Sequence, residues 1–77
     1  MEDAREIKFE IVRKFGVLSE GSRNWRKEIN LVSWNDREPK IDIRDWAEDH
    51  TRMGKGITLN RDEAARLYEF LGTFLQS

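Results

Sequence analysis

Two short segments near the middle of the chain alternate apolar and polar side chains, and a run of turn-forming residues separates them. The segments are residues 29–34 (INLVSW) and 41–46 (IDIRDW), and the separating run is residues 35–39 (NDREP). Successive side chains of a strand point to opposite faces of a sheet, so this alternation predicts two strands. Asn, Asp and Pro between them predict a turn, and hence an antiparallel pair.

The same reasoning predicts two more strands and one helix. The strands are expected at residues 7–18, 25–34, 40–46 and 55–59, with a turn at 19–22 and a polar loop at 47–54. Gly16 is expected to bend or bulge the long first strand. The chain is therefore predicted to be a single α+β domain over residues 1–77, a four-stranded antiparallel sheet followed by one C-terminal helix (ββββα), with residues 1–6 flexible.

The helix has a well-defined start and a wide apolar stripe. Asn60 is a good N-cap, Glu63 completes a capping box, and Asp62 complements the helix dipole. The apolar residues recur at helical spacing and exceed what a small sheet needs to be covered. Because a twofold dimer pairs the same patch with itself, we expect a helix-to-helix seam. The residues expected in this seam are Leu67, Phe70, Leu71 and Phe74.

Size and cysteine content also favour a homodimer. A chain of 77 residues has only a small core, and without cysteine it has neither disulfides nor a thiolate metal site to stabilise it. Oligomerisation is the remaining common device. The lack of cysteine fits a reducing compartment, and no apolar run is long enough for a signal peptide or a membrane span. We therefore expect a cytoplasmic protein, associated with the nucleoid if it is bacterial.

The charge balance permits a nucleic-acid partner without demanding one. The net charge of −1 is unlike that of a strongly basic, generic polyanion binder. Residues 7–59 carry eleven basic and nine acidic side chains, whereas the two ends together carry three basic and six acidic ones. The middle of the chain is thus mildly positive, although an ordinary solvated surface with mixed charges explains the same numbers.

Two tryptophans end the alternating segments and share one predicted face of the sheet. If the isoleucines of these strands face the core, Trp34 and Trp46 face outward. Exposed aromatic rings among cations are typical of proteins that stack unpaired bases. Trp25 shares its face with Ile29 and Leu31 and is expected to be structural. The basic residues grouped with the two outward tryptophans as candidate nucleic-acid contacts are Lys14, Arg26, Lys27, Arg37, Lys40, Arg44 and Lys55.

Catalytic and metal-binding patterns are weak. His50 is the single histidine, and it lies in an acidic loop without cysteine, so neither a zinc site nor an oriented general base is indicated. The loop acids lack the order of an EF-hand, and Gly54-Lys55-Gly56 lacks the spacing of a phosphate-binding loop. The sequence therefore predicts no enzyme, no cofactor and no metal.

Two motifs resemble the transcriptional coactivator positive cofactor four family and its bacterial relatives. Residues 40–46 (KIDIRDW) are similar to the family's apolar-Asp-apolar-Arg-acid-aromatic strand, and residues 54–59 (GKGITL) are similar to its Lys-Gly-Ile-Ser/Thr-Leu strand before the terminal helix. The resemblance covers residues 23–75. It implies a homodimer whose strongly curved sheets form grooves for single-stranded DNA, with little sequence specificity.

The resemblance also implies roles for individual residues. Trp34 matches an aromatic position that stacks on bases, and the matching basic positions of the groove are Lys27, Lys40, Arg44 and Lys55. The chain departs from the family pattern after the arginine strand, where Trp46 is followed by Ala47 instead of a second aromatic residue. The next loop is also shorter, and Ala64 and Ala65 replace an aromatic residue of the first helical turn.

The favoured interpretation is a non-enzymatic single-stranded DNA-binding protein that supports transcription regulation, replication or repair. RNA is a second candidate ligand, and transcription or replication proteins are candidate partners. Two alternatives stay open. Trp34 and Trp46 form an apolar hot spot for a partner protein in the first. In the second, a structural dimer buries both tryptophans in higher assembly.

Overall fold

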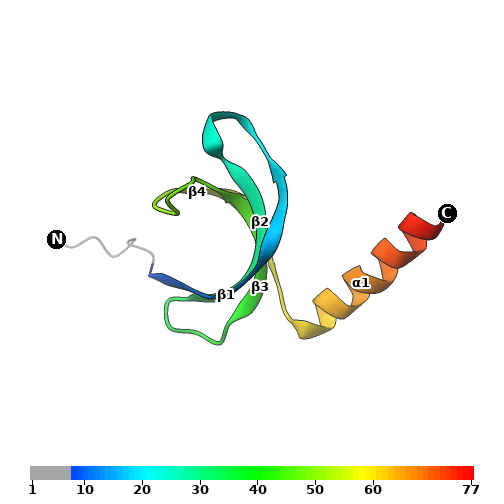
Figure 1. Ribbon diagram of the computed structural model, residues 1–77. Helices are drawn as coiled ribbons and strands as arrows, with labels where there is room; N and C mark the ends of the chain where they lie inside the picture. Colours follow the sequence, from blue (N-terminus) through cyan, green and yellow to red (C-terminus); the bar gives the residue numbers. More distant parts are fainter. Residues whose placement is uncertain (1–7) are drawn as a thin grey trace.

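The structure, a computed structural model, describes residues 8–77, so the expected flexible segment 1–6 lies outside the described residues. A four-stranded sheet is followed by a single long helix (Figure 1). The elements are β1 (Phe9–Glu20), a short 3-10 turn (Ser22–Asn24), β2 (Arg26–Trp34), β3 (Lys40–Trp46), β4 (Met53–Leu59) and α1 (Arg61–Gln76). The predicted ββββα order is confirmed.

The strands pair in sequence order, β1-β2-β3-β4, and each pair is antiparallel. Two strand ends extend beyond the prediction, whereas β1 and β2 begin at Phe9 and Arg26 instead of residues 7 and 25. The first strand continues to Glu20, so the turn lies two residues later, and β4 begins at Met53 inside the expected loop. Both extensions lengthen the sheet, because edge residues without apolar alternation still pair through their backbones.

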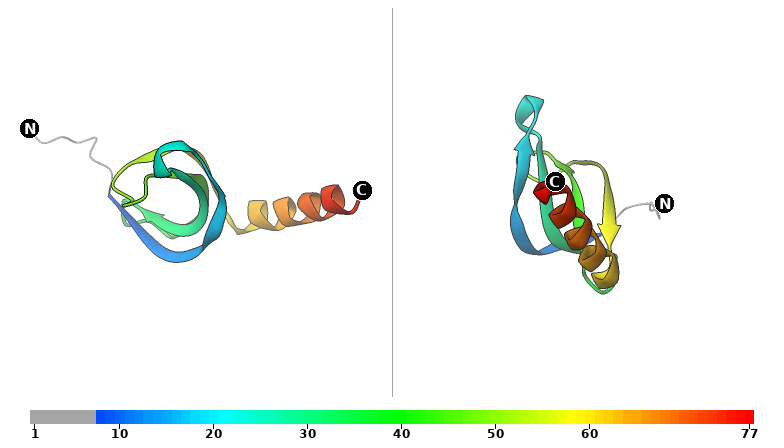
Figure 2. Two further views of the ribbon diagram at one scale, coloured as in Figure 1. Left: turned by 45° about the horizontal axis from the view of Figure 1, so that its top comes forward. Right: turned by 90° about the vertical axis from the view of Figure 1, so that its right-hand side faces the viewer.

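The sheet bends around one of its faces, which we call the inner face (Figure 2). The pairing of β1 with β2 shifts at three places, between Ile11 and Arg13, between Lys14 and Gly16, and between Val17 and Ser19. Such bulges bend and twist a strand. The strong curling implied by the family resemblance is not found, since the sheet stays open with β1 and β4 as its two edges.

The best-packed part of the molecule is the inner face, and this corrects the expected core. Val32 and Trp46 are fully buried there, together with the polar side chains of Glu28, Asn30 and Asp42. The outer face carries the apolar residues expected in the core, and they are only half-buried: Ile29, Leu31, Ile41 and Ile43. The alternation of side chains along the strands is confirmed. The prediction that the isoleucine face is the packed face is wrong, because in residues 8–77 the opposite face is more deeply buried.

Helix α1 begins as predicted but does not cover the sheet. The Asn60 side chain accepts a hydrogen bond from the Glu63 N–H at 2.8 Å, and the Glu63 carboxylate accepts one from the Asn60 N–H at 2.8 Å. The helix then projects away from the sheet (Figures 1 and 2). Its apolar residues are consequently exposed: Tyr68, Phe70, Leu71, Phe74 and Leu75. No helix in residues 8–77 is long and apolar enough to cross a membrane.

Candidate nucleic-acid interface

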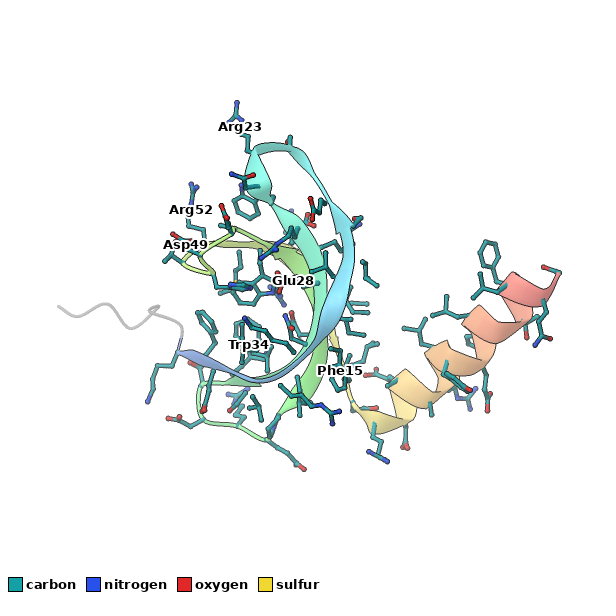
Figure 3. All side chains as sticks on the ribbon, in the orientation of Figure 1. Phe15, Arg23, Glu28, Trp34, Asp49 and Arg52 are labelled. Carbon is teal, nitrogen blue, oxygen red and sulfur yellow. The ribbon has the colours of Figure 1, made fainter. Side chains whose placement is uncertain are left out.

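A cavity of about 380 Å³ opens on the inner face where β2 ends. Four of the residues predicted from the sequence line it together: Trp34, Arg37, Lys40 and Arg44. They come from β2, from the turn after it and from β3, so the fold collects one aromatic ring and three cations that the sequence spreads over eleven positions. Figure 3 shows Trp34 and Glu28 on the side around which the sheet bends.

A tight turn fixes Trp34 at the rim of this cavity. Asn35 and Asp36 both have positive φ, 52° and 64°, and the Arg37 N–H donates to the Trp34 carbonyl at 2.9 Å. Two left-handed central residues are the geometry of a type I′ hairpin turn, which Asn and Asp tolerate well. The turn is tied to the start of β1 by a Lys8–Asp36 ion pair of 2.8 Å. The main chain at Trp34 is thereby fixed at the end of β2.

The guanidinium of Arg44 stacks on Trp34. Its Cζ atom lies 4.8 Å from the centre of the indole ring, a cation–π distance. On its other side, Nε donates to both carboxylate oxygens of Asp42, at 2.7 and 2.9 Å, and Nη1 donates to the Gly54 carbonyl at 3.2 Å. Asp42 is fully buried and the Arg44 side chain is only 14% exposed. Arg44 is therefore a fixed part of the Trp34 platform, and Asp42 already compensates its charge.

Close backbone packing supports this arrangement from β4. Gly56 pairs with Arg44, and a Cβ atom at Gly56 would collide with the Arg44 Cβ and the Ile43 carbonyl oxygen. Only glycine fits this approach, so the second glycine of the Gly54-Lys55-Gly56 motif has a packing role. The motif that superficially resembles a phosphate-binding loop thus serves to bring β4 against Arg44.

The two remaining cations of the cavity are free of ion pairs among the described residues. Arg37 and Lys40 are both exposed, and neither lies within 4.0 Å of a carboxylate in residues 8–77. Glu38 also lines the cavity and reduces its positive charge. Arg37 and Lys40 are consequently the cavity residues that can contact phosphate, whereas Arg44 offers mainly a flat surface.

Trp46 does not join this cavity, and its predicted exposure is wrong. It is fully buried, with the Phe9 ring 5.2 Å and the His50 ring 5.3 Å from its own, centre to centre. Phe9 also lies 5.8 Å from Trp34, so one ring of β1 bridges the two tryptophans. The bend of the sheet and the loop after β3 enclose Trp46. It cannot stack on a base while the loop stays in place.

A buried ionic network closes the same end of the inner face. Nε2 of His50 lies 3.0 and 3.2 Å from the two carboxylate oxygens of Glu28, and the Asn30 amide donates to Glu28 at 3.1 Å. Burial raises the pKa of Glu28, but the hydrogen bonds from His50 and Asn30 and the charges of His50 and Arg26 outweigh it, so the net pKa is lowered. His50 therefore has a structural role, because its contact with Glu28 holds the loop after β3 against the inner face.

The other predicted basic residues lie outside the cavity. Arg26 is half-buried beside Glu28, with 3.6 Å between its Nε and a carboxylate oxygen. Lys14 is exposed opposite Asn30 on β1, Lys55 is exposed on β4, and Lys27 is exposed opposite Asp45 in the strand register at the other end of β2. The structure thus separates the nine predicted nucleic-acid contacts into four that share one cavity and five that do not.

Sequence reasoning missed three lining residues, Glu38, Met53 and Thr58. Thr58 lies opposite Asp42 on β4, and Met53 lies opposite Trp46. The alternation of residues 55–59 would have placed Thr58 on the inner face once the register was known. No sequence signal marks Met53, because the irregular pairing between Arg44 and Trp46 shifts β4 at that point.

Metal chemistry finds no support in the part of the chain that the structure describes. Residues 8–77 contain no group of three or more His, Asp or Glu side chains placed to hold a metal ion. His50 is occupied by Glu28, and Asp49 accepts two hydrogen bonds from Thr51, which lower the pKa of Asp49. The acidic loop is thus stabilised by its own hydrogen bonds.

Comparisons with known proteins place the chain in a family. Residues 22–70, more than half of the chain, match the model of the family described as Transcriptional Coactivator p15 (PC4). A protein of Treponema pallidum (strain Nichols), described only as uncharacterized, is 40% identical over 68 residues, which cover 88% of this chain and 80% of that protein. The chain belongs to the transcriptional coactivator p15 (PC4) family.

Proposed function

We propose that this protein binds single-stranded DNA in the Trp34 cavity, largely independently of sequence and without catalysing a reaction. The observation that carries the proposal is that one cavity groups a half-buried tryptophan with two cations that form no ion pair within residues 8–77, in a chain from a family of non-enzymatic DNA-binding coactivators. Transcription regulation is the first biological role to test, and replication or repair is the second.

Stacking supplies the sequence-tolerant part of the proposed affinity. Every base has a π-face, and one base stacked on an aromatic ring contributes about 1–3 kcal/mol. Trp34 is half-buried, and it contacts the Arg44 guanidinium at 4.8 Å and the Phe9 ring at 5.8 Å. A platform held in this way loses little conformational freedom on binding, so more of the stacking energy is expressed as affinity.

Phosphate contacts supply the salt-dependent part. Arg37 and Lys40 lie beside the stacking ring and are exposed. Each phosphate contact to a single strand lowers log K by about 0.7 per decade of salt, so two contacts predict a slope of about −1.4 for this cavity. Duplex DNA keeps its bases stacked and paired and therefore cannot place one on Trp34.

The protein acts as a homodimer in this proposal. Phe70, Leu71 and Phe74 are 62%, 48% and 71% exposed on a helix that projects from the sheet, and Leu67 lies half-buried on the same helix. Isolated surface leucines need no explanation, but a continuous row of large apolar residues marks an interaction surface. We propose that a second copy of the chain covers this apolar row. We also propose that the dimer is located in the cytoplasm, and that transcription or replication proteins are further partners.

Fluorescence anisotropy with labelled oligo-dT, the corresponding duplex and a matched RNA tests the proposal at low and moderate salt. We expect salt-dependent binding of the DNA single strand and much weaker binding of the duplex, while the RNA arm decides whether RNA is also a ligand. If no oligonucleotide binds, the cavity has another ligand, and a partner protein anchored on Trp34 becomes the alternative. Trp46 cannot contribute to such a hot spot because it is buried.

A further inference from the structure

A second group of one tryptophan and several cations lies at the opposite end of β2 from Trp34. Trp25 is half-buried just before the strand, and the Arg52 guanidinium carbon lies 5.6 Å from the centre of its ring. A cavity of about 570 Å³ opens beside it. Its lining residues are Ser19, Gly21, Ser22, Arg23, Trp25, Lys27 and Asp45. Figure 3 shows Arg23 and Arg52 at this end of the molecule, away from Trp34.

The turn between β1 and β2 fixes Trp25 through both of its backbone groups. The Trp25 N–H donates to the Ser22 carbonyl at 3.1 Å, and the Trp25 carbonyl accepts from the Gly21 N–H at 2.7 Å. Arg23 and Asn24 adopt left-handed backbone conformations, with φ of 59° and 63°, so that the turn can close. The main chain at Trp25 is therefore fixed, and the Arg52 guanidinium contacts the ring itself.

The position of the ring separates this cavity from the Trp34 cavity. A Cβ atom built on Gly54 would lie 3.5 Å from the Asp45 Cβ and 3.9 Å from Cζ3 of Trp25, so the indole rests beside these two residues. Asp45 lies between Arg44 and Trp46 in β3 and therefore points to the opposite face. The second cavity consequently opens on the outer side of the sheet.

The charge around Trp25 favours an anionic ligand. Arg23, Lys27 and Arg52 are exposed, and none of them forms an ion pair within the described part of the chain. Asp45 is the acidic residue of the lining. Asp49 is close enough to Arg52 to feel its charge, although Thr51 already satisfies the Asp49 carboxylate by hydrogen bonds. Three cations therefore face two acids.

We infer that Trp25 is a second stacking position for nucleic acid, reached by single strands long enough to extend beyond the Trp34 cavity around the sheet edge. One base stacks on Trp25, and Arg23, Lys27 and Arg52 contact the neighbouring phosphates. The inference rests on the proposed function. Because the nine residues of β2 span ~30 Å at 3.3 Å per residue, a short oligonucleotide fills one cavity only.

The test compares two strand lengths and two tryptophans. Oligo-dT of roughly 5 nucleotides is close to the smallest of the ~4–16 nucleotide sites of single-strand-binding folds, and oligo-dT of roughly 20 nucleotides exceeds the largest. Trp25→Ala is expected to weaken binding of the long strand by about 5- to 150-fold and to leave the short strand unchanged. Trp34→Ala is expected to weaken both. Tyr68→Ala, which removes an 80% exposed ring from α1, is the matched control.

Further variants keep the test decisive if Trp25→Ala lowers stability. Trp25→Phe retains a stacking ring and is expected to restore long-strand binding, and the double variant Arg23→Gln, Arg52→Gln is expected to flatten the salt dependence for the long strand alone. Equal losses for both lengths, or normal long-strand binding by Trp25→Ala, overturn the second position while the Trp34 proposal stands. If the unaltered protein binds neither length, the proposed function itself fails.

Discussion

Trp34 and Trp46 occupy equivalent places in the sequence but opposite environments in the molecule. Each ends an alternating strand, and both side chains lie on the inner face. Trp34 is half-buried at the rim of a cavity with Arg44 on its ring, whereas Trp46 is fully buried beneath Phe9 and His50. One end of the inner face is therefore open and the other is closed.

The difference shows what decides whether an aromatic ring binds a ligand or stabilises the fold. The turn after Trp34 is tied back to Lys8, and the ring, although Arg44 stacks on it, still lines the cavity. The segment after Trp46 is held over the sheet by the contact between His50 and Glu28. Strand alternation determines the face of a side chain, but the neighbouring loop determines its exposure.

Removing the ring at the closed end is expected to have the largest effect. Trp46→Ala leaves a large cavity in a small core and is expected to cost about 3–5 kcal/mol of unfolding free energy. Trp34→Ala, at a half-exposed position, is expected to cost much less. Urea unfolding of both variants measures this comparison. Equal losses of stability would mean that the two ends are not distinct.

Breaking the support of Arg44 comes next. Asp42→Asn removes the fully buried charge that compensates Arg44, and loss of one partner of a buried ion pair costs about 3–5 kcal/mol. The 14% exposure of Arg44 lets water reach the pair and places the expected loss at the lower end. Urea unfolding checks the stability, and oligo-dT anisotropy is expected to show weaker binding as the platform loosens. Unchanged values in both measurements would remove the positioning role of Asp42.

Truncating the ring at the open end is expected to act on binding. Trp34→Ala should lower the affinity for oligo-dT by about 1–3 kcal/mol, because one stacked base is lost. The loss should be similar at low and high salt, since no phosphate contact is removed. Anisotropy titrations at several salt concentrations measure it, with Tyr68→Ala as the control. An unaltered affinity would exclude stacking on Trp34.

The smallest expected effect concerns the contact between His50 and Glu28 at the closed end of the inner face, and it depends on pH. The pKa of Glu28 is lowered in the folded state, so its ionised form stabilises the fold above the unfolded pKa, and this contribution disappears as the pH falls through the folded value. Glu28→Gln is expected to cost about 1–2 kcal/mol near neutral pH. The difference in unfolding free energy between the two proteins, measured by urea unfolding, should narrow in acid. A difference that stays constant across pH would contradict a stabilising charge on Glu28.

Much of the fold could be predicted from local patterns. Alternation located the strands because a half-buried sheet repeats every two residues, and the capping box of Asn60 and Glu63 located the start of α1. The packed side of the sheet could not be predicted. No local sequence pattern predicts that the helix projects away from the sheet or that Phe9 and His50 cover Trp46. Both features depend on contacts between segments that are distant in the sequence.

The candidate site was predicted in part for the same reason. Trp34, Arg37, Lys40 and Arg44 are neighbours in sequence or across one hairpin, and the structure brings them to one cavity. The sequence did not predict that Arg44 is paired with Asp42. An arginine two residues after an aspartate on the same strand face can be either free or paired. The register in which the strands pair decides whether the arginine is free or paired, and the sequence alone does not give this register.

The indole N–H signals of the three tryptophans offer the most direct test of the central claim. Each gives a separate ¹H–¹⁵N resonance that a Trp→Phe variant assigns, and short oligo-dT is titrated into the labelled protein. We expect the Trp34 signal to shift saturably while the Trp46 signal stays fixed. A shift at Trp46 equal to that at Trp34, or no shift at Trp34 despite binding, would contradict a single strand held at the open end of the inner face.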